Sequence, residues 1–336
     1  MKILIYSDIH ISQDSSIVKS FGEKYSTRLE HIIKSLDWAE DLALKEHCEA
    51  VFNLGDTFDK PIIQPMEATA VQDIKWNNLP HYILVGNHDS NVESLEYSSV
   101  SILKKLGFNI ITETTHLNIN NVDFTFIPYI TNDNRKQFKE YIKSENDIVL
   151  SHNDIAGFNF GRFISKDGFD IKDIEKNCRL YLNGHLHNSS FLSSKILNVG
   201  NLCGQNFTEN SFKYKHGSWI LDTDNLSLNF YENPYALNFY NIEYKEEKDL
   251  NTIKNNSVLQ IKCERKNNNK LKENLDRIKD KIIATRVLLY DVKSSESFDT
   301  SIKLEKVDYI KQFIDFIHDK VGDTDLVNFE LQEICK

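Results

Sequence analysis

The sequence is poor in cysteine, proline and glycine. Its 336 residues include only 5 Cys, 5 Pro and 12 Gly. So little glycine and proline excludes a collagen-like or low-complexity chain. The cysteines are scattered and odd in number, with no CxxC pair, and therefore indicate neither a disulfide framework nor a zinc ribbon. A reducing compartment is the default expectation.

Long apolar runs are also absent. None approaches the roughly 20 residues that a membrane helix needs, and the amino-terminal Ile3-Leu4-Ile5 run is followed too soon by Asp8 and His10 to form a signal-peptide core. We expect a soluble cytoplasmic protein without membrane association, or one in the host cytoplasm if the source is viral. The 40 Lys and Arg against 50 Asp and Glu give a formal charge of -10, which opposes nonspecific attraction to nucleic acid but allows a local phosphate site.

The hydrophobic content of 40% supplies enough core for one large domain and a smaller one. Up to about residue 230, short apolar runs alternate with helix-like stretches, which predicts sheets covered by helices. Strands are predicted at 2–6, 50–54, 81–85, 147–150 and 180–183, with a hairpin where 117–119 meets 122–127, and the clearest helix spans 27–46. Further strands at 191–193, 196–199, 219–221 and 226–231 are expected to form a second, antiparallel layer.

A domain boundary is predicted near Asn233-Pro234. The following unit has a β-α-β rhythm, with a strand at 258–263, an amphipathic helix at 271–282 and a strand at 286–292. Residues 301–336 are expected to be helical, with an apolar stripe on a charged background. The predicted organisation is a large domain at 1–232, a small domain at 233–298 and a helical segment at 299–336.

Potential metal ligands follow five predicted strands, each time at the carboxyl end. The clusters are Asp8-Ile9-His10, Gly55-Asp56-Thr57-Phe58-Asp59, Gly86-Asn87-His88-Asp89, His152 and Gly184-His185-Leu186-His187, and they contain five of the eleven histidines. Layered α/β proteins bind their ligands at this end of the strands. Each cluster alone is compatible with an ordinary loop or turn. The ordered set indicates a pair of divalent cations bridged by a shared carboxylate.

The same set resembles the motif series of the calcineurin-like metallophosphoesterases: D-x-H, G-D-x-x-D, G-N-H-[D/E], H and G-H-x-H. The resemblance covers about residues 1–222. It implies an α/β (α+β) fold, namely a two-sheet β-sandwich flanked by helices, with the dimetal centre at its rim. Within this superfamily the chain looks most like the SbcD-type nuclease subunits of DNA repair and recombination, including bacteriophage recombination endonucleases. The form of the G-D-T-F-D and G-N-H-D motifs, the segment 198–222 and a small unit at 235–293 similar to their DNA-capping domain carry this narrower resemblance.

Carried over by motif, the resemblance assigns a role to each cluster. It implies one metal ion held by Asp8, His10, Asp56 and His187, and a second held by Asp56, Asn87, His152 and His185, with Asp56 as the bridge. His88 is implied as a catalytic residue that helps to protonate the leaving oxygen, with Asp59, or less readily Asp89, orienting its ring. The ions are expected to be Mn²⁺, with Fe²⁺ or Zn²⁺ as alternatives. Since only Asp8 and Asp56 are anionic ligands, the ions leave a local positive surplus that attracts phosphate.

The implied function is that of a dimetal-dependent DNA nuclease subunit, an exonuclease on double-stranded ends and an endonuclease on single strands or hairpins. Implied partners are DNA, an SbcC-like coiled-coil ATPase subunit, and a second copy of the chain in a homodimer within a heterotetramer. Residues 264–281, with seven Lys or Arg against four Asp or Glu, are a candidate DNA surface or a solvated helix face. The segment 301–336, with five Lys and eight Asp or Glu, is a core element or a docking segment for the ATPase.

Two other functions remain open from the sequence. A phosphoesterase acting on small substrates, such as a nucleotidase or a cyclic-nucleotide phosphodiesterase, would share the whole dimetal set, although the small domain and terminal helix argue against it. A noncatalytic scaffold with the same fold would have lost metal ligands, whereas none is lost in this sequence.

Overall fold

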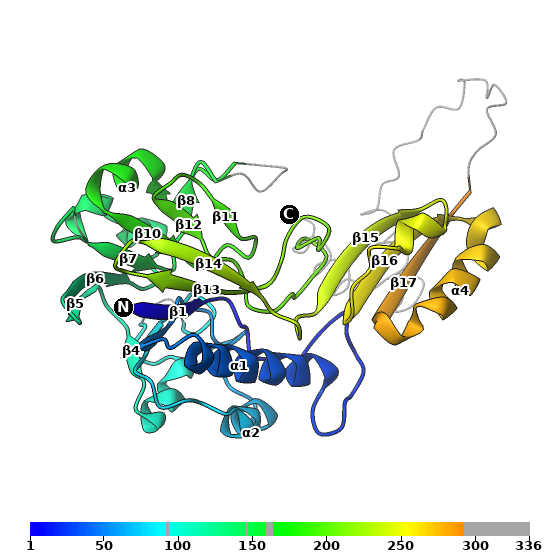
Figure 1. Cartoon of the computed structure of the whole chain (residues 1–336), viewed down its shortest axis with the longest axis horizontal. Helices are drawn as coiled ribbons and strands as arrows, with labels where there is room; N and C mark the ends of the chain where they lie inside the picture. Colours follow the sequence, from blue (N-terminus) through cyan, green and yellow to red (C-terminus); the bar gives the residue numbers. More distant parts are fainter. Residues whose placement is uncertain (92–93, 146, 159–163, 292–336) are drawn as a thin grey trace, which may run out of the picture. The chain divides into compact units, whose positions relative to one another are not determined.

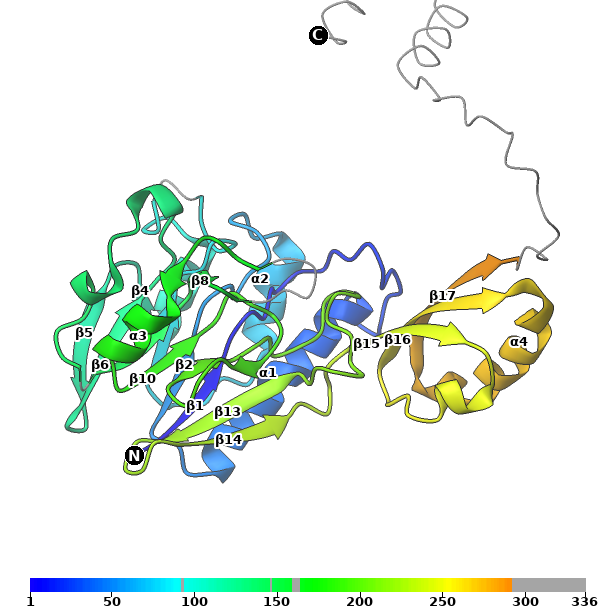
Figure 2. The same ribbon diagram turned by 90° about the horizontal axis from the view of Figure 1, so that it is seen from above.

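The computed structural model describes residues 1–91, 94–145, 147–158 and 164–291. Within these ranges the chain forms two six-stranded sheets, a three-stranded sheet and a two-stranded ribbon (Figures 1 and 2). Residues 1–291 group as one compact unit. The expected helical segment 299–336 and the end of the small domain lie outside the described residues. The predicted boundary after residue 232 stays a prediction.

The first sheet has the strand order β14-β13-β1-β2-β3-β4. Its strands are β1 (Lys2–Tyr6), β2 (Ala50–Asn53), β3 (His81–Leu84), β4 (Asn109–Ile111), β13 (Gly217–Asp222) and β14 (Ser227–Glu232). Strands β1 to β4 are parallel, whereas β13 is antiparallel to β1 and to β14. The connections after β1 and β2 contain the helices α1 (Thr27–Lys45) and α2 (Pro65–Asp73), which pack on one face of this sheet.

The second sheet has the order β11-β12-β10-β7-β6-β5. Its strands are β5 (Thr115–Ile119), β6 (Val122–Ile127), β7 (Ile148–Ser151), β10 (Leu180–Asn183), β11 (Ser190–Phe191) and β12 (Ile196–Asn198). The ribbon of β8 (Ile155–Ala156) and β9 (Phe169–Asp170) and the helix α3 (Ile171–Asn177) lie between β7 and β10 in sequence. The predicted hairpin is confirmed: Asn120 and Asn121 have φ angles of 50° and 65°, as a tight turn between β5 and β6 requires.

The antiparallel layer expected after Gly184 is wrong. Strand β12 pairs in parallel with β10 in the second sheet, whereas β13 and β14 extend the first sheet. Short apolar strands fit either sheet, since their pairing depends on the route of the chain and not on their composition. Leu221 of β13, for example, lies opposite Ile3 of β1 and adds to the core between the sheets.

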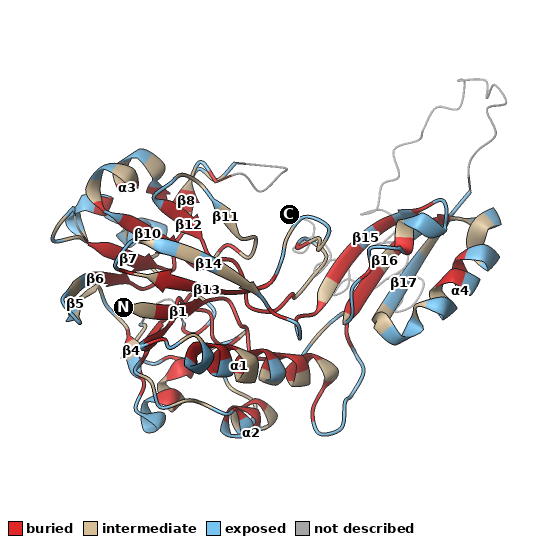
Figure 3. Cartoon of the chain, viewed as in Figure 1, coloured by how far each residue is buried: buried red, intermediate tan, exposed pale blue. Residues whose placement is uncertain are grey.

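The core lies in three layers, which explains why the strands are apolar on both faces. Ile3 and Ile5 of β1 face the second sheet, whereas Leu4 and Tyr6 face α1. A third layer packs α3 on the outer face of the second sheet. Figure 3 shows the central strands buried and α1 buried along one side. This sandwich between helices is the fold class that the sequence predicts.

The third sheet follows the sandwich in sequence. Its three parallel strands are β15 (Asn238–Tyr244), β16 (Ser257–Glu264) and β17 (Ile282–Tyr290). Helix α4 (Asn268–Arg277) connects β16 to β17 and buries Leu271 against one face of this sheet. The predicted strand, helix and strand are confirmed, although the helix ends five residues earlier than predicted. No helix in the described ranges is long and apolar enough to cross a bilayer.

Candidate dimetal site

The five sequence clusters lie at the carboxyl ends of β1, β2, β3, β7 and β10. The loops after β1 and β2 run side by side, because the amides of Asp8 and His10 donate to the carbonyls of Gly55 and Asp56, each at 3.0 Å. The loop after β10 joins them, since the amide of His185 donates to Oδ2 of Asp8 at 3.0 Å. The two sheets therefore bring residues as far apart in sequence as Asp8 and His185, 177 positions, into one site.

The backbone of this site is strained. Asp8, His10, Asp56 and His185 have φ angles of 52°, 50°, 50° and 73°, in the left-handed region that side-chain-bearing residues rarely adopt. Each such residue costs roughly 1–2 kcal/mol. Strain of this kind gathers at functional sites, where the surrounding structure holds it in place.

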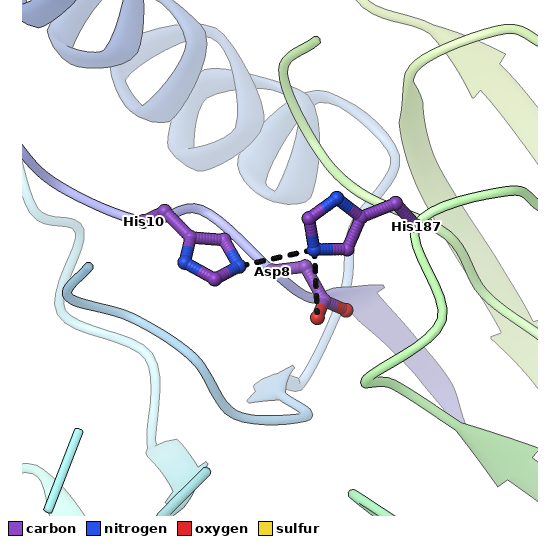
Figure 4. Close-up of side chains that lie close together, drawn as sticks. All are labelled: Asp8, His10 and His187. Atoms are coloured by element: carbon purple, nitrogen blue, oxygen red, sulfur yellow. Dashed lines mark hydrogen bonds and ion pairs between the residues drawn. The ribbon is translucent and has the colours of Figure 1, made fainter. Parts of the chain in front are cut away.

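Asp8, His10 and His187 form the first ligand cluster (Figure 4). The Nε2 atoms of His10 and His187 lie 3.2 Å apart, and Nε2 of His187 lies 3.9 Å from Oδ1 of Asp8. Oδ1 of Asp8 is buried and has no hydrogen-bond partner. Two imidazole nitrogens and a carboxylate oxygen thus converge on one point, as the ligands of a divalent cation do.

Asp56, His152 and His185 form the second cluster. Oδ2 of Asp56 lies 3.2 Å from Nε2 of His152 and 3.6 Å from Nε2 of His10, so this carboxylate borders both clusters. Nδ1 of His185 and Oδ1 of Asn87 are buried without hydrogen-bond partners. Unpaired buried polar atoms are costly unless a ligand satisfies them, and these donor types fit a second divalent cation. The residues present therefore fit a dimetal centre.

His88 lies at the exposed side of the site, with its ring edge-on to that of His10 at 4.7 Å between centroids. Its Nδ1 lies 3.0 Å from the main-chain carbonyl of Asp59. Asp59 thus orients the ring through its carbonyl and not its carboxylate, which lies 3.4 Å from Nδ1 of His10. Asp89 instead accepts the amides of Phe58 and Gly86 at 2.8 and 2.9 Å, which fixes the loops after β2 and β3.

Charge coupling outweighs burial in the pair of Asp56 and His152. Burial favours the neutral form of Asp56, but the adjacent His152 holds the pKa of this carboxyl well below its usual range. Burial likewise disfavours the His152 cation, yet Asp56 raises the pKa of this imidazole to about 9. Without metal, His152 and Asp56 therefore form an ion pair at neutral pH. A divalent cation binding to both must displace the proton of His152.

Two carboxylates of the site escaped the sequence analysis. Glu209 is fully buried and accepts Nδ1–H of His187 at 2.7 Å, and this contact raises the pKa of His187 to about 9 against the effect of burial. Oδ1 of Asp154 lies 3.1 Å from Nε2 of His185. Asp154 could have been noticed two positions after His152, whereas nothing in the sequence marks Glu209. The carboxylates of Glu209, Asp154 and Asp59 lie close to the site. They make the local positive charge expected with two bound divalent ions smaller than a count of the ligands Asp8 and Asp56 alone predicts.

Comparisons with known proteins agree with this geometry. The model of the calcineurin-like phosphoesterase family matches residues 1–189. The DNA double-strand break repair protein Mre11 of Sulfolobus acidocaldarius is 23% identical over 307 residues, which cover 84% of this chain and 74% of that protein.

Similar solved structures include a novel archaeal phosphodiesterase, at 14% identity, TM-score 0.37, and coverage of 69% of this chain and 99% of that one. The TT1561 protein of Thermus thermophilus, also 14% identical, has a TM-score of 0.41 with coverage of 69% and 98%. A dimetal phosphatase from Danio rerio is 10% identical, with a TM-score of 0.40 and coverage of 66% and 91%. The family match, which spans more than half of the sequence and includes all five ligand clusters, shows that the chain belongs to the calcineurin-like phosphoesterases, dimetal-dependent hydrolases of phosphoesters.

Proposed function

We propose that the chain is a dimetal-dependent DNA nuclease subunit of the SbcD type, acting in DNA repair or recombination. The observation that carries the proposal is the position of Asp56 between two ligand clusters, 3.6 Å from His10 and 3.2 Å from His152. A pair of cations bridged by one carboxylate suits phosphodiester hydrolysis. The likeness to Mre11, a DNA repair protein, extends over 84% of the chain and so beyond the phosphoesterase match.

The proposed ligand sets are those that the motifs imply. Asp8, His10, Asp56 and His187 would hold one ion, and Asp56, Asn87, His152 and His185 the other. The oxygen and imidazole donors, without thiolates, favour Mn²⁺. Ions bound there would lower the pKa of a bound water and offset the negative charge that builds up on the phosphate in the transition state.

His88 is proposed as the general acid of the reaction. Its Nδ1 faces the carbonyl of Asp59, which leaves Nε2 as the ring atom available to a substrate. The exposed position of the ring suits a group that meets the leaving oxygen, and the ring also lies with His10 and Asp56 in a third group of potential ion ligands. Asp89 supports this arrangement by fixing the loops that carry Asp56 and His88.

The proposal includes an exonuclease activity on double-stranded ends, an endonuclease activity on single strands or hairpins, a homodimer, and an SbcC-like ATPase partner. The parallel sheet of β15 to β17 is proposed as a DNA-capping domain, with its boundary near residue 233. The basic run at 264–281 contributes less charge than its composition suggests, because Arg265, Lys266 and Arg277 pair with Asp291, Glu264 and Glu247 at 2.7–3.1 Å. This pairing favours a solvated helix face over a DNA surface at 264–281.

The test uses the metal-stripped protein with a labelled DNA hairpin and, separately, bis-p-nitrophenyl phosphate, each with and without Mn²⁺. We expect Mn²⁺-dependent cutting of the hairpin that is lost in both Asp56→Ala and His88→Ala. Hydrolysis of the small diester without cleavage of any DNA, even after addition of the ATPase partner, would contradict the nuclease proposal. That outcome would favour the small-substrate phosphoesterase.

A further inference from the structure

The two histidines of the last motif differ in the groups behind their rings. His187 donates Nδ1–H to Glu209, whereas His185 faces Asp154 through Nε2. The other ring nitrogen of His187 faces His10, and that of His185 is buried without a hydrogen-bond partner. A carboxylate behind a ligating imidazole fixes the tautomer and makes the ring a better donor. The two carboxylates should therefore tune the two metal positions separately.

Glu209 is built to remain a fixed anion. Its side chain is 1% exposed, and its oxygens accept four hydrogen bonds, from Nδ1 of His187, Nδ2 of Asn201, the amide of Gln205 and Nδ2 of Asn206, at 2.7–3.2 Å. Three of these partners are N–H donors by their chemistry, and the ionised carboxylate can accept from all three as well as from Nδ1–H of His187. Asn201 is fixed in turn, because its Oδ1 lies 2.6 Å from Nδ1 of the buried His216.

Asp154 should have a smaller electrostatic effect on His185 than Glu209 has on His187. Its side chain is 24% exposed, and its Oδ2 lies 3.6 Å from Nη2 of Arg135. Solvent screens its charge, and the guanidinium offsets part of it. The proposed direct ligands also give the His187 position more negative charge. Its cluster includes the carboxylate of Asp8, whereas the proposed ligands around His185 include the neutral amide of Asn87.

We propose that Glu209 is a positioning residue that raises the metal affinity of one of the two positions. This is the position formed by Asp8, His10, Asp56 and His187, and it should therefore bind its ion first. This order of ion binding rests on the proposed ligand sets and can be measured without DNA.

The test is a titration of the metal-stripped full chain with Mn²⁺, in which calorimetry gives the steps and electron paramagnetic resonance counts the free ion. We expect two separate steps in the wild type. Asn87→Ala should keep the tight step and lose the weak one, whereas Asp8→Asn should lose the tight step. Two equal steps in the wild type, or loss of the tight step in Asn87→Ala, would overturn the inference.

The role of Glu209 is tested by Glu209→Gln, with Asp154→Asn as the matched control. Glu209→Gln should weaken the tight step by about 10–100-fold, the usual effect of losing the partner of a ligating histidine, and leave the weak step unchanged. Asp154→Asn should affect only the weak step. Glu209→Asp, which keeps the charge, should recover part of the affinity. Equal weakening of both steps by Glu209→Gln would refute the role, and circular dichroism of each metal-free variant shows whether it folds.

Discussion

Replacing His88 with alanine tests the chemistry of the site most directly. The ring projects from the loop after β3 and is held by the carbonyl of Asp59 at 3.0 Å, while the main-chain amide of His88 donates to Oδ1 of Asp56 at 2.9 Å. Alanine keeps this amide, so the Asp56 carboxylate should stay in place. His88→Ala should therefore bind Mn²⁺ as the wild type does and lose only the proposed proton donor.

The size of the effect should depend on the leaving group. Loss of a general acid costs about 10²–10⁴-fold, or roughly 2.7–5.4 kcal/mol of transition-state stabilisation. A sugar oxygen leaving from DNA needs that proton, whereas p-nitrophenolate leaves readily as an anion. We expect His88→Ala to lose about 10²–10⁴-fold on DNA and far less on bis-p-nitrophenyl phosphate.

Single-turnover rates on both substrates and the Mn²⁺ content by atomic absorption check this prediction. Asp56→Ala should lose activity on both substrates together with the metal. His116→Ala, in the hairpin of β5 and β6, serves as a matched histidine control. Equal losses of His88→Ala on the two substrates would refute the acid role, and loss of Mn²⁺ would make His88 a ligand instead.

Three further predictions concern the fold and the metal. The buried carboxylate of Glu40 lies 3.0 Å from Nε2 of the buried His81 and accepts the amide of Asn77 at 3.2 Å, so Glu40→Leu would leave polar atoms without partners. This variant should lower the free energy of unfolding in urea by about 1–3 kcal/mol and leave Mn²⁺ binding intact, and an unchanged free energy of unfolding would speak against this. Gly86→Ala would place a Cβ 2.5 Å from the amide nitrogen of Asp56 and against its carboxylate. This variant should therefore fold but bind Mn²⁺ poorly, and an unchanged calorimetric titration with Mn²⁺ would contradict the clash. Mn²⁺ at 100 times its dissociation constant should stabilise the stripped protein by about 2.7 kcal/mol per site in thermal unfolding, with no such shift in Asp56→Ala.

The ligand clusters were predictable because parallel strands align their carboxyl ends. Once Asp8, Asp56 and Asn87 are placed after neighbouring strands, the fold has to bring them together. The second sheet does the same for His152 and His185. The alternation of apolar and polar residues, together with the turn residues, was also sufficient to predict the hairpin and the strands on either side of α4.

Other features depend on long-range packing that local patterns do not encode. Glu209 reaches His187 through a loop of irregular structure whose path no periodicity specifies. The choice of sheet for β12 and β13 follows from where the chain crosses, not from their apolar residues. His88 contacts the main-chain carbonyl of Asp59 and not its carboxylate, because of the direction in which the backbone runs there. The residue type alone does not reveal this direction.

The left-handed backbone at Asp8, His10, Asp56 and His185 lowers the stability of the protein as long as these side chains are kept. Glycine at any of these positions would relax the main chain. A search for stabilising substitutions that does not also select for metal binding would therefore remove the proposed ligands. Directed evolution of a heat-resistant form should therefore keep these four residues and look for stabilising substitutions at other positions, because stabilising a functional site commonly costs activity.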